Sequence, residues 1–254
     1  MGDLEALFYC FVAIVIGITL FVGGFKSLRQ KRLIESTPTS KVRSIAMGLV
    51  EVYGEVVPAK KKLLKSPLTG KDCVYYKYQV EEYRRSGKSS RWVVIDSFQE
   101  GTHFFLKDDT GCVLVEPAGA NVDIPADFTC RSGAGRVIPD SVKGFMTKKN
   151  LPYKSGMFFS KELKFTEYLI EPKDKLYIMG TAGDNPFVEE ATGKENVEDI
   201  MIQKGKHEKI YYISDKPEKD ILKKFKWAVI GGLFGGGALI VLGLAGIFIY
   251  FGVF

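Results

Sequence analysis

Two long runs without a charged side chain constrain this chain more than any other feature. One covers Trp227 to Phe254 and the other covers Ala6 to Phe25. An α-helix rises about 1.5 Å per residue, so roughly 20 apolar residues cross the hydrocarbon core of a bilayer. The two runs therefore predict transmembrane helices at 6–25 and 227–254.

The first run also has the length of a signal peptide. Signal peptides begin with basic residues, have a shorter apolar core and end at a small-residue cleavage site. Here the tail of residues 1–5 is acidic, with Asp3 and Glu5, and the run ends next to Lys26 and Arg29. We therefore expect a retained membrane anchor.

The net charge of +6 lies almost entirely beside these runs. Residues 26–43 hold six basic side chains and one acidic one, and residues 216–226 hold five basic and two acidic ones. Between them, residues 44–215 are neutral. A neutral body is a poor match for a phosphate backbone, whose binding depends on clustered Lys and Arg. We therefore expect no nucleic acid among the partners.

The basic flanks also predict the orientation of the chain. Lys and Arg next to a transmembrane helix favour the cytoplasmic side, and both flanks adjoin the central domain. We expect a cytoplasmic domain with both termini outside; the residues that determine this topology are Lys26, Arg29, Lys31, Arg32, Lys219, Lys223, Lys224 and Lys226. Outside the predicted spans the cysteines are odd in number, which fits free thiols in a reducing compartment.

The central domain reads as mainly β. Short runs rich in β-branched and aromatic residues, such as "GLVEVYGEVV" and "KLYIMGTAG", alternate with turn sequences, and "DDTG" at Asp108–Gly111 predicts a hairpin. We expect a small antiparallel barrel or sandwich at 44–213, with two OB-like units as one arrangement. A basic linker at 26–43 precedes it. A basic helix at 214–226, with Asp215 as N-cap and Pro217 in its first turn, continues into the second span.

Four stretches, in order, resemble the GIDE family, whose "beside a membrane" domain occurs in mitochondrial outer-membrane ubiquitin ligases and in many bacterial and archaeal proteins. They are "SPLTGKDCVYYKYQVEEY", "FLKDDTGCVLVEPAGANVD", "FTEYLIEPKDKLYIMGTA" and "YYISDKPEKDILKKFKW". The resemblance implies a β domain between two membrane helices. It also implies, from the mitochondrial members, a domain between two membranes, but we follow the charge asymmetry of this chain.

The family's ligases continue after the second span into a zinc-binding RING domain. Such a domain needs closely spaced Cys and His pairs for two tetrahedral zinc sites. The sequence ends at Phe254 without such pairs. We therefore expect the RING mechanism to be unavailable to this chain.

No other pattern in the chain predicts catalysis, a cofactor or a metal. Tens of residues separate most of the possible zinc ligands, so structural thiols are favoured over a zinc site or a thiol nucleophile; these residues are Cys73, Cys112, Cys130, His103 and His207. The "TGKD" and "TGKE" stretches lack the other residues of a phosphate loop, and no Gly-x-Ser-x-Gly occurs. Asp108 and Asp109 are ordinary hairpin residues.

The run "VYYKYQVEEYRR" has two interpretations. Interleaved Tyr and Lys side chains stack on bases in some nucleic-acid-binding barrels. Alternation with a period of two explains the run equally well, with Tyr76, Tyr78 and Val80 on a buried face. Because the body is neutral, we favour the half-buried strand.

Five glycines crowd the second predicted span. Gly231 and Gly235, and likewise Gly232 and Gly236, are four residues apart, and so each pair shares a helix face. Small residues let another helix approach closely, although Gly is also common in membrane helices. The first span offers a small face at Ala13 and Gly17. We expect these residues to pack the spans together, within a chain or between copies in a homo-oligomer.

Two functions from different classes remain. The first is a scaffold or protein-interaction module, held in the lipid bilayer and binding other membrane or cytoplasmic proteins. The second, implied by the resemblance, is a part in ubiquitin-like transfer in which a separate protein supplies the catalysis. Co-purification with a RING or conjugating-enzyme homologue would favour the second.

Overall fold

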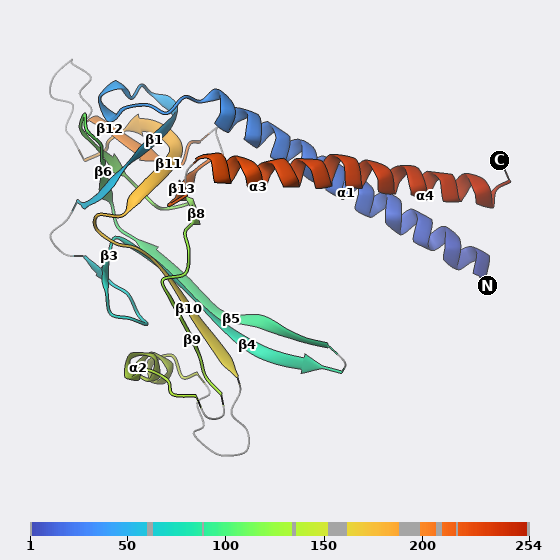
Figure 1. Ribbon diagram of the computed structural model, residues 1–254, viewed down its shortest axis with the longest axis horizontal. Coiled ribbons are helices and arrows are strands. Elements are labelled where there is room, and N and C mark those ends of the chain that lie inside the picture. Colours follow the sequence, from blue (N-terminus) through green and yellow to red (C-terminus); the bar gives the residue numbers. More distant parts are fainter. Residues whose placement is uncertain are drawn as a thin grey trace. The chain divides into compact units, whose positions relative to one another are not determined.

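The computed structural model describes residues 2–59, 63–87, 89–133, 136–151, 162–187, 199–206, 210–216 and 218–252 (Figure 1). The chain forms two compact units, and each is described by itself. A helical unit combines Met1–Pro38 with Lys216–Phe254, and a β unit covers Thr39–Asp215.

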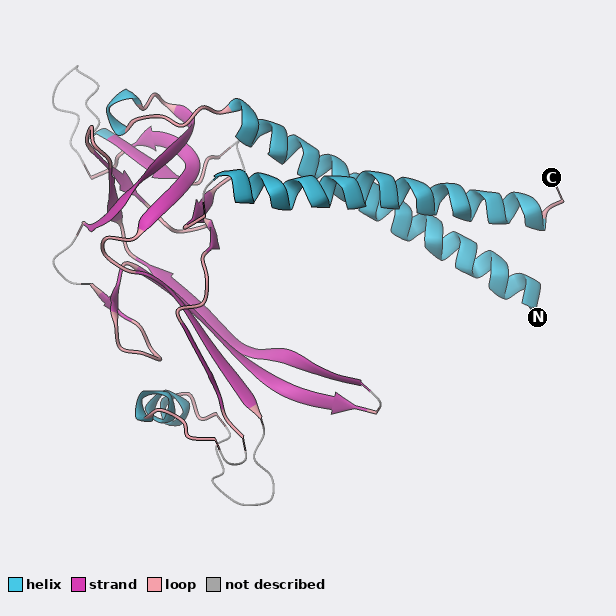
Figure 2. Ribbon diagram, in the orientation of Figure 1, coloured by secondary structure: helices cyan, strands magenta, loops and turns pink. Residues whose placement is uncertain are grey.

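The helical unit is a pair of long helices, drawn in cyan in Figure 2. Helix α1 covers Gly2–Ser36. The second helix consists of α3 (Glu218–Ile230), a π-helical turn η3 (Gly231–Gly235) and α4 (Gly236–Tyr250), and α1 contacts all three segments. Apolar stretches at Glu5–Ser36 and Leu222–Tyr250 are long enough to cross a membrane.

Helix α1 extends further than the sequence pattern predicted. Residues 26–36, expected as part of a linker, are helical. This segment contains good helix formers and no Gly, and an ion pair of 2.9 Å joins Lys31 to Glu35 one turn later. Pro38, which cannot continue a helix, follows the last turn. At the second helix, Pro217 lies outside the described residues, and α3 begins at Glu218.

The β unit contains a closed five-stranded barrel. Its strands are β1 (Gly48–Pro58), β6 (Phe104–Lys107), β7 (Cys112–Val115), β12 (Ile200–Gln203) and β11 (Lys175–Asp184). They neighbour one another in that order, and β11 pairs back to β1 to close the ring. Only β7 and β12 are parallel. In chain order β7 and β12 are the third and fifth strands of the barrel. This spatial order, with the third and fifth strands parallel, is that of an OB-type barrel.

A four-stranded antiparallel sheet forms the second part of the β unit. Its order is β5 (Ser89–Gly101), β4 (Tyr75–Ser86), β10 (Leu163–Ile170) and β9 (Phe128–Arg131). Helix α2 (Asp140–Lys148) packs on one face, where the rings of Tyr78 and Phe145 have centroids 5.0 Å apart. The described residues therefore hold one barrel and one helix-covered sheet, and not two OB-like units.

Two segments of the chain are inserted between barrel strands, and both contribute strands to the four-stranded sheet. The chain leaves the barrel after β1 and forms β2 (Leu64–Lys65), β3 (Asp72–Cys73), β4 and β5 before returning at β6. It leaves again after β7, forms β8 (Asn121–Asp123), β9, α2 and β10, and returns at β11. The last strand, β13 (Tyr212–Ser214), joins β11 to β8. Each part has its own apolar core.

Several strand predictions are confirmed. The Asp108–Gly111 turn connects β6 and β7 in an antiparallel hairpin. The runs "GLVEVYGEVV" and "KLYIMGTAG", predicted as strands, lie in β1 and β11, which pair directly, with Val52 opposite Ile178. In β4, Tyr76, Tyr78 and Val80 are buried against the core under α2, as the alternation predicted.

Candidate functional site

Glycines bring the two long helices into backbone contact. A Cβ built on Gly232 would lie 2.6 Å from the Cα of Gly24, and one built on Gly236 would lie 2.7 Å from the carbonyl oxygen of Gly17. Real Cβ atoms do not come this close to backbone. The contact therefore requires glycine at these positions, as in small-residue interfaces of membrane helices.

The contact continues towards the chain termini. A Cβ at Gly243 would lie 2.6 Å from Cγ1 of Ile14, and one at Gly246 would lie 2.5 Å from Sγ of Cys10. Gly243 and Gly246 belong to α4, and Cys10 and Ile14 to α1. The interface thus follows one side of each helix over most of its apolar length.

Only some of the predicted packing residues lie in the interface between the helices. Gly17, Gly232 and Gly236 lie in the interface, whereas a Cβ on Gly231 or Gly235 would meet no atom within 4 Å. Ala13 is half-buried. Sequence reasoning missed Gly24, although its spacing of seven residues from Gly17 places both on the same helix face.

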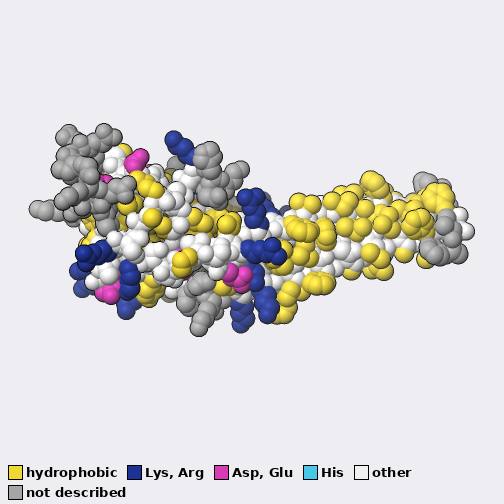
Figure 3. Space-filling model, turned by 90° about the horizontal axis from the view of Figure 1, so that it is seen from above, with side chains coloured by type: hydrophobic (Ala, Val, Ile, Leu, Met, Phe, Trp, Pro, Cys, Tyr) yellow, Lys and Arg dark blue, Asp and Glu magenta, His cyan; other side chains and the backbone are white. Residues whose placement is uncertain are grey.

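Figure 3 shows Lys and Arg side chains gathered where the apolar surface of the helix pair ends. The side chains of Lys26, Arg29 and Arg32 on α1 are exposed, and so are those of Lys223, Lys224 and Lys226 on α3. Lys31 is half-buried and pairs with Glu35, while the side chain of Lys219 lies outside the described residues.

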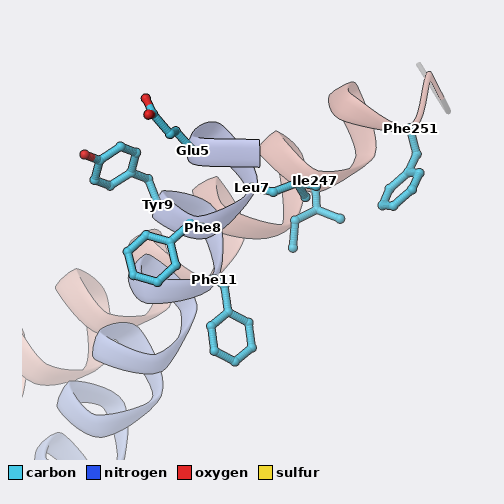
Figure 4. A pocket seen from close by; sticks show the side chains of 7 residues that line it. All are labelled: Glu5, Leu7, Phe8, Tyr9, Phe11, Ile247 and Phe251. Carbon is cyan, nitrogen blue, oxygen red and sulfur yellow. The ribbon is translucent and has the colours of Figure 1, made fainter. Parts of the chain in front are cut away.

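An open groove lies at the other end of the helix pair, near the chain termini (Figure 4). Its lining is almost wholly apolar; the residues are Glu5, Leu7, Phe8, Tyr9, Phe11, Ile247 and Phe251. In a bilayer such a surface contacts lipid chains and headgroups, and the aromatic rings suit the interfacial belt.

A buried carboxylate organises the "SPLTGKD" loop of the β unit. Glu167 of β10 has no exposed surface. It accepts hydrogen bonds from the backbone N–H of Leu68 at 2.8 Å, from the backbone N–H of Thr69 at 3.2 Å and from the Thr69 hydroxyl at 2.6 Å. These donors satisfy the buried carboxyl oxygens, so Glu167 has a structural role in this arrangement.

A second carboxylate, Asp108, closes the β6–β7 turn. One of its oxygens accepts the backbone N–H groups of Thr110 and Gly111 and the Thr110 hydroxyl; the other accepts the N–H of Val42 at 2.9 Å. Partial burial opposes ionisation, but these hydrogen bonds outweigh it and hold the pKa of Asp108 below its usual range. Asp108 therefore stabilises the turn of the hairpin, the role that the sequence predicted for it.

The thiols and histidines of the β unit are the zinc-ligand candidates that the sequence offered. Burial, with nearby carboxylates adding to it, raises the pKa of Cys73 to about 12, and burial also raises the pKa of Cys130. Cys112 is exposed, the ring of His103 packs against Phe187, and His207 lies outside the described residues. Among the described residues, no three His, Cys, Asp or Glu side chains are grouped to hold a metal ion.

The comparison with protein families decides where this chain belongs. The family model for GIDE, described as an E3 ubiquitin ligase, matches residues 75–247, which include most of the β unit and of the second long helix. The chain belongs to the GIDE family. No curated protein and no solved structure matches it. With its two apolar helices, it is a membrane protein of that family.

The GIDE protein has one further surface on which aromatic and basic side chains meet. On the face of the four-stranded sheet opposite α2, Lys77 lies over the ring of Tyr168, and both Arg131 and Lys164 lie over the ring of Trp92. Lys164 also forms an ion pair of 2.8 Å with Glu81. The interleaved Tyr and Lys of β4 thus pack as a half-buried strand, with the Tyr rings of its other face in the core.

Proposed function

We propose that this GIDE protein is a membrane-held scaffold whose β unit binds protein partners at the cytoplasmic face. The observation that carries the proposal is the glycine contact between its two long helices. Two spans in backbone contact form one firm anchor, and two separate segments connect that anchor to the β unit.

The connecting segments are short. Helix α1 ends at Ser36 and the β unit begins at Thr39, while the β unit ends at Asp215 and α3 begins at Glu218. Two short connections limit the orientations that a domain can adopt, and a limited orientation lowers the entropic cost of binding a partner in the same membrane. The basic residues at the helix ends support the cytoplasmic placement.

The chemistry of the β unit also supports binding over catalysis. The carboxylates of Glu167 and Asp108 are engaged by backbone donors, and the thiol of Cys73 has its pKa raised away from the reactive range. Groups with these partners hold loops in place and are not poised as nucleophiles or general bases.

A ubiquitin-transfer role is the second candidate, because the matching family is described as an E3 ubiquitin ligase. The two functions differ in a measurable rate. A conjugating enzyme charged with ubiquitin is mixed with a RING protein that supplies the catalysis, and release of ubiquitin from the thioester to free lysine is followed with and without the purified full chain in nanodiscs.

A scaffold leaves this rate unchanged, whereas acceleration would overturn the proposal in favour of the second candidate. A photo-reactive side chain at exposed Lys107, with one at exposed Lys26 on the helix pair as a comparison, then identifies neighbours in native membranes. The scaffold proposal expects a defined protein cross-linked through the β unit and recovered without attached ubiquitin.

A further inference from the structure

The hairpin formed by β4 and β5 extends beyond the sheet that supports it (Figure 1). Strand β10 pairs with β4 only as far as Glu82, which lies opposite Leu163. The N–H of Tyr83 still donates to the carbonyl of Glu162 at 2.9 Å, but from Arg84 and Arg91 to the turn no described residue outside β4 and β5 pairs with the two strands. Two strands by themselves form only a marginally stable ribbon in water, so a further contact at this end would add to its stability.

The end of this ribbon is strongly basic. From Tyr83 to Ile95 the sequence holds Arg84, Arg85, Lys88 and Arg91 and no acidic residue. Lys88 lies outside the described residues.

Two of these arginines lie directly opposite each other. Arg84 and Arg91 are cross-strand partners, and like charges in that position repel. Glu82 accepts a bond of 2.7 Å from Arg84. Among the described residues, no acidic side chain forms an ion pair with Arg85 or Arg91, so an external anion would relieve the repulsion.

The other face of the ribbon is aromatic. Tyr83 and Trp92 are cross-strand partners with ring centroids 5.2 Å apart. Arg85 lies over the Tyr83 ring at 5.9 Å, and Arg131 lies over the Trp92 ring at 5.3 Å. Trp, Tyr and Arg together are the side chains that favour the headgroup region of a bilayer, because they are apolar along one part and polar at another.

We propose that the tip of the β4–β5 hairpin binds anionic lipid headgroups of the membrane that the helices cross. The β unit is joined to the two spans at both of its ends, so the effective concentration of headgroups around it is high. Each basic side chain near an anionic surface strengthens such binding about fivefold. Arginine also matches a phosphate group with two parallel hydrogen bonds.

Nucleic acid is the competing anion, and the charges outside the tip argue against it. A nucleic-acid site tracks many phosphates with Lys and Arg along a groove. Here residues 44–215 as a whole carry equal numbers of basic and acidic side chains, so the β unit outside the hairpin tip has no net positive charge. A compact basic and aromatic tip fits a single layer of headgroups better.

Tryptophan fluorescence tests the proposal on the full chain. The protein has two Trp residues, so Trp227→Phe leaves Trp92 as the sole emitter. The variant is reconstituted in nanodiscs of phosphatidylcholine alone or mixed with phosphatidylglycerol, each with a spin-labelled headgroup as quencher. We expect strong quenching of Trp92 only in the anionic discs, with quenching lost at high salt.

Charge variants locate the contact. Arg84→Gln with Arg91→Gln should reduce quenching to the level in phosphatidylcholine, whereas Arg84→Lys with Arg91→Lys should retain it. Lys107→Gln with Lys175→Gln removes the same charge from exposed barrel positions and should have no effect. Equal quenching in both lipids, or unchanged quenching in the Gln variant, would overturn the proposal. The proposal would also be overturned if single-stranded nucleic acid protected Trp92 from quenching while the lipid composition made no difference.

Discussion

Gly236 of the second long helix lies against the carbonyl oxygen of Gly17 on the first, and a Cβ on Gly236 would come within 2.7 Å of that oxygen. Gly232 and Gly24 form an equivalent contact, one turn away along the second helix and two turns away along the first. Glycine weakens a helix in water by about 1 kcal/mol per residue relative to alanine. Its repeated use here is explained by the close approach of two backbones.

The first prediction is a disulfide across this interface. A Cβ on Gly246 would lie 3.9 Å from the Cβ of Cys10, within the range of natural disulfides. We expect Gly246→Cys to form a disulfide with native Cys10 under mild oxidation. After proteolytic cleavage within the β unit, the two helices should then remain linked on a non-reducing gel.

The same disulfide measures the importance of the glycines. Gly232→Leu together with Gly236→Leu should separate the helices and lower the disulfide yield severalfold, because a side chain at either position meets backbone. Gly231→Leu together with Gly235→Leu is the matched control, since these positions meet no atom within 4 Å. Equal yields from both double variants would show that the glycines do not determine the packing.

The second prediction concerns orientation and uses a native thiol. Cys112 is exposed, whereas Cys73 is buried. If the basic flanks set the topology, an impermeant maleimide should label Cys112 only after the cells are permeabilised. Because Cys130 is only half-buried, the experiment uses a Cys130→Ser background, in which Cys112→Ser should abolish that labelling. Glu5→Cys, near the outside terminus, should be labelled in intact cells. Labelling of Cys112 in intact cells would place the β unit outside.

The third prediction concerns the boundaries of the β unit. Residues 39–215 should fold alone with a β-rich circular dichroism spectrum, because this segment has its own cores. The shorter segment 44–213 lacks Val42, which is fully buried, and Ser214, whose hydroxyl donates to the Asp123 carbonyl. We expect it to be less stable by about 3 kcal/mol in urea unfolding. Equal midpoints would show that these ends contribute nothing.

How far the sequence predicts this fold depends on whether the signal is local. The alternation in β4 and the Asp108–Gly111 turn are local, and both predictions are confirmed. Strand β10 escaped notice because its alternation is broken, with Thr166 and Glu167 buried next to each other. Glu167 is buried because it binds Leu68 and Thr69, almost a hundred positions earlier, which no local pattern shows.

The helix interface shows the same limit. A spacing of four predicts that Gly231 shares a face with Gly235, and Gly232 with Gly236, but it does not say which face meets the other helix. The choice depends on the partner helix, where Gly17 and Gly24 face the second pair. Likewise, closure of the barrel depends on pairing between β1 and β11, which are far apart in the chain.

The last prediction links Asp108 to the pH dependence of stability. Its hydrogen bonds hold the pKa of the carboxyl below the usual range in the folded state, despite partial burial. A carboxyl with a depressed folded pKa stabilises the protein above its unfolded pKa of about 4, and this contribution is lost as the pH falls through the folded pKa. Asp108 should therefore stabilise the β unit at neutral pH and lose that effect in acid.

Asp108→Asn tests this, because an amide N–H₂ placed at either carboxylate oxygen would face backbone donors such as the N–H of Val42. Urea unfolding of residues 39–215 at pH 7 should show a loss of about 1–2 kcal/mol. The difference from wild type should shrink at about pH 3, where the wild-type carboxyl begins to take up a proton. Asp109→Asn removes only an exposed ion pair with Lys41 and should leave the stability almost unchanged. A loss for Asp108→Asn that stays constant down to acid pH would mean that its charge does not contribute.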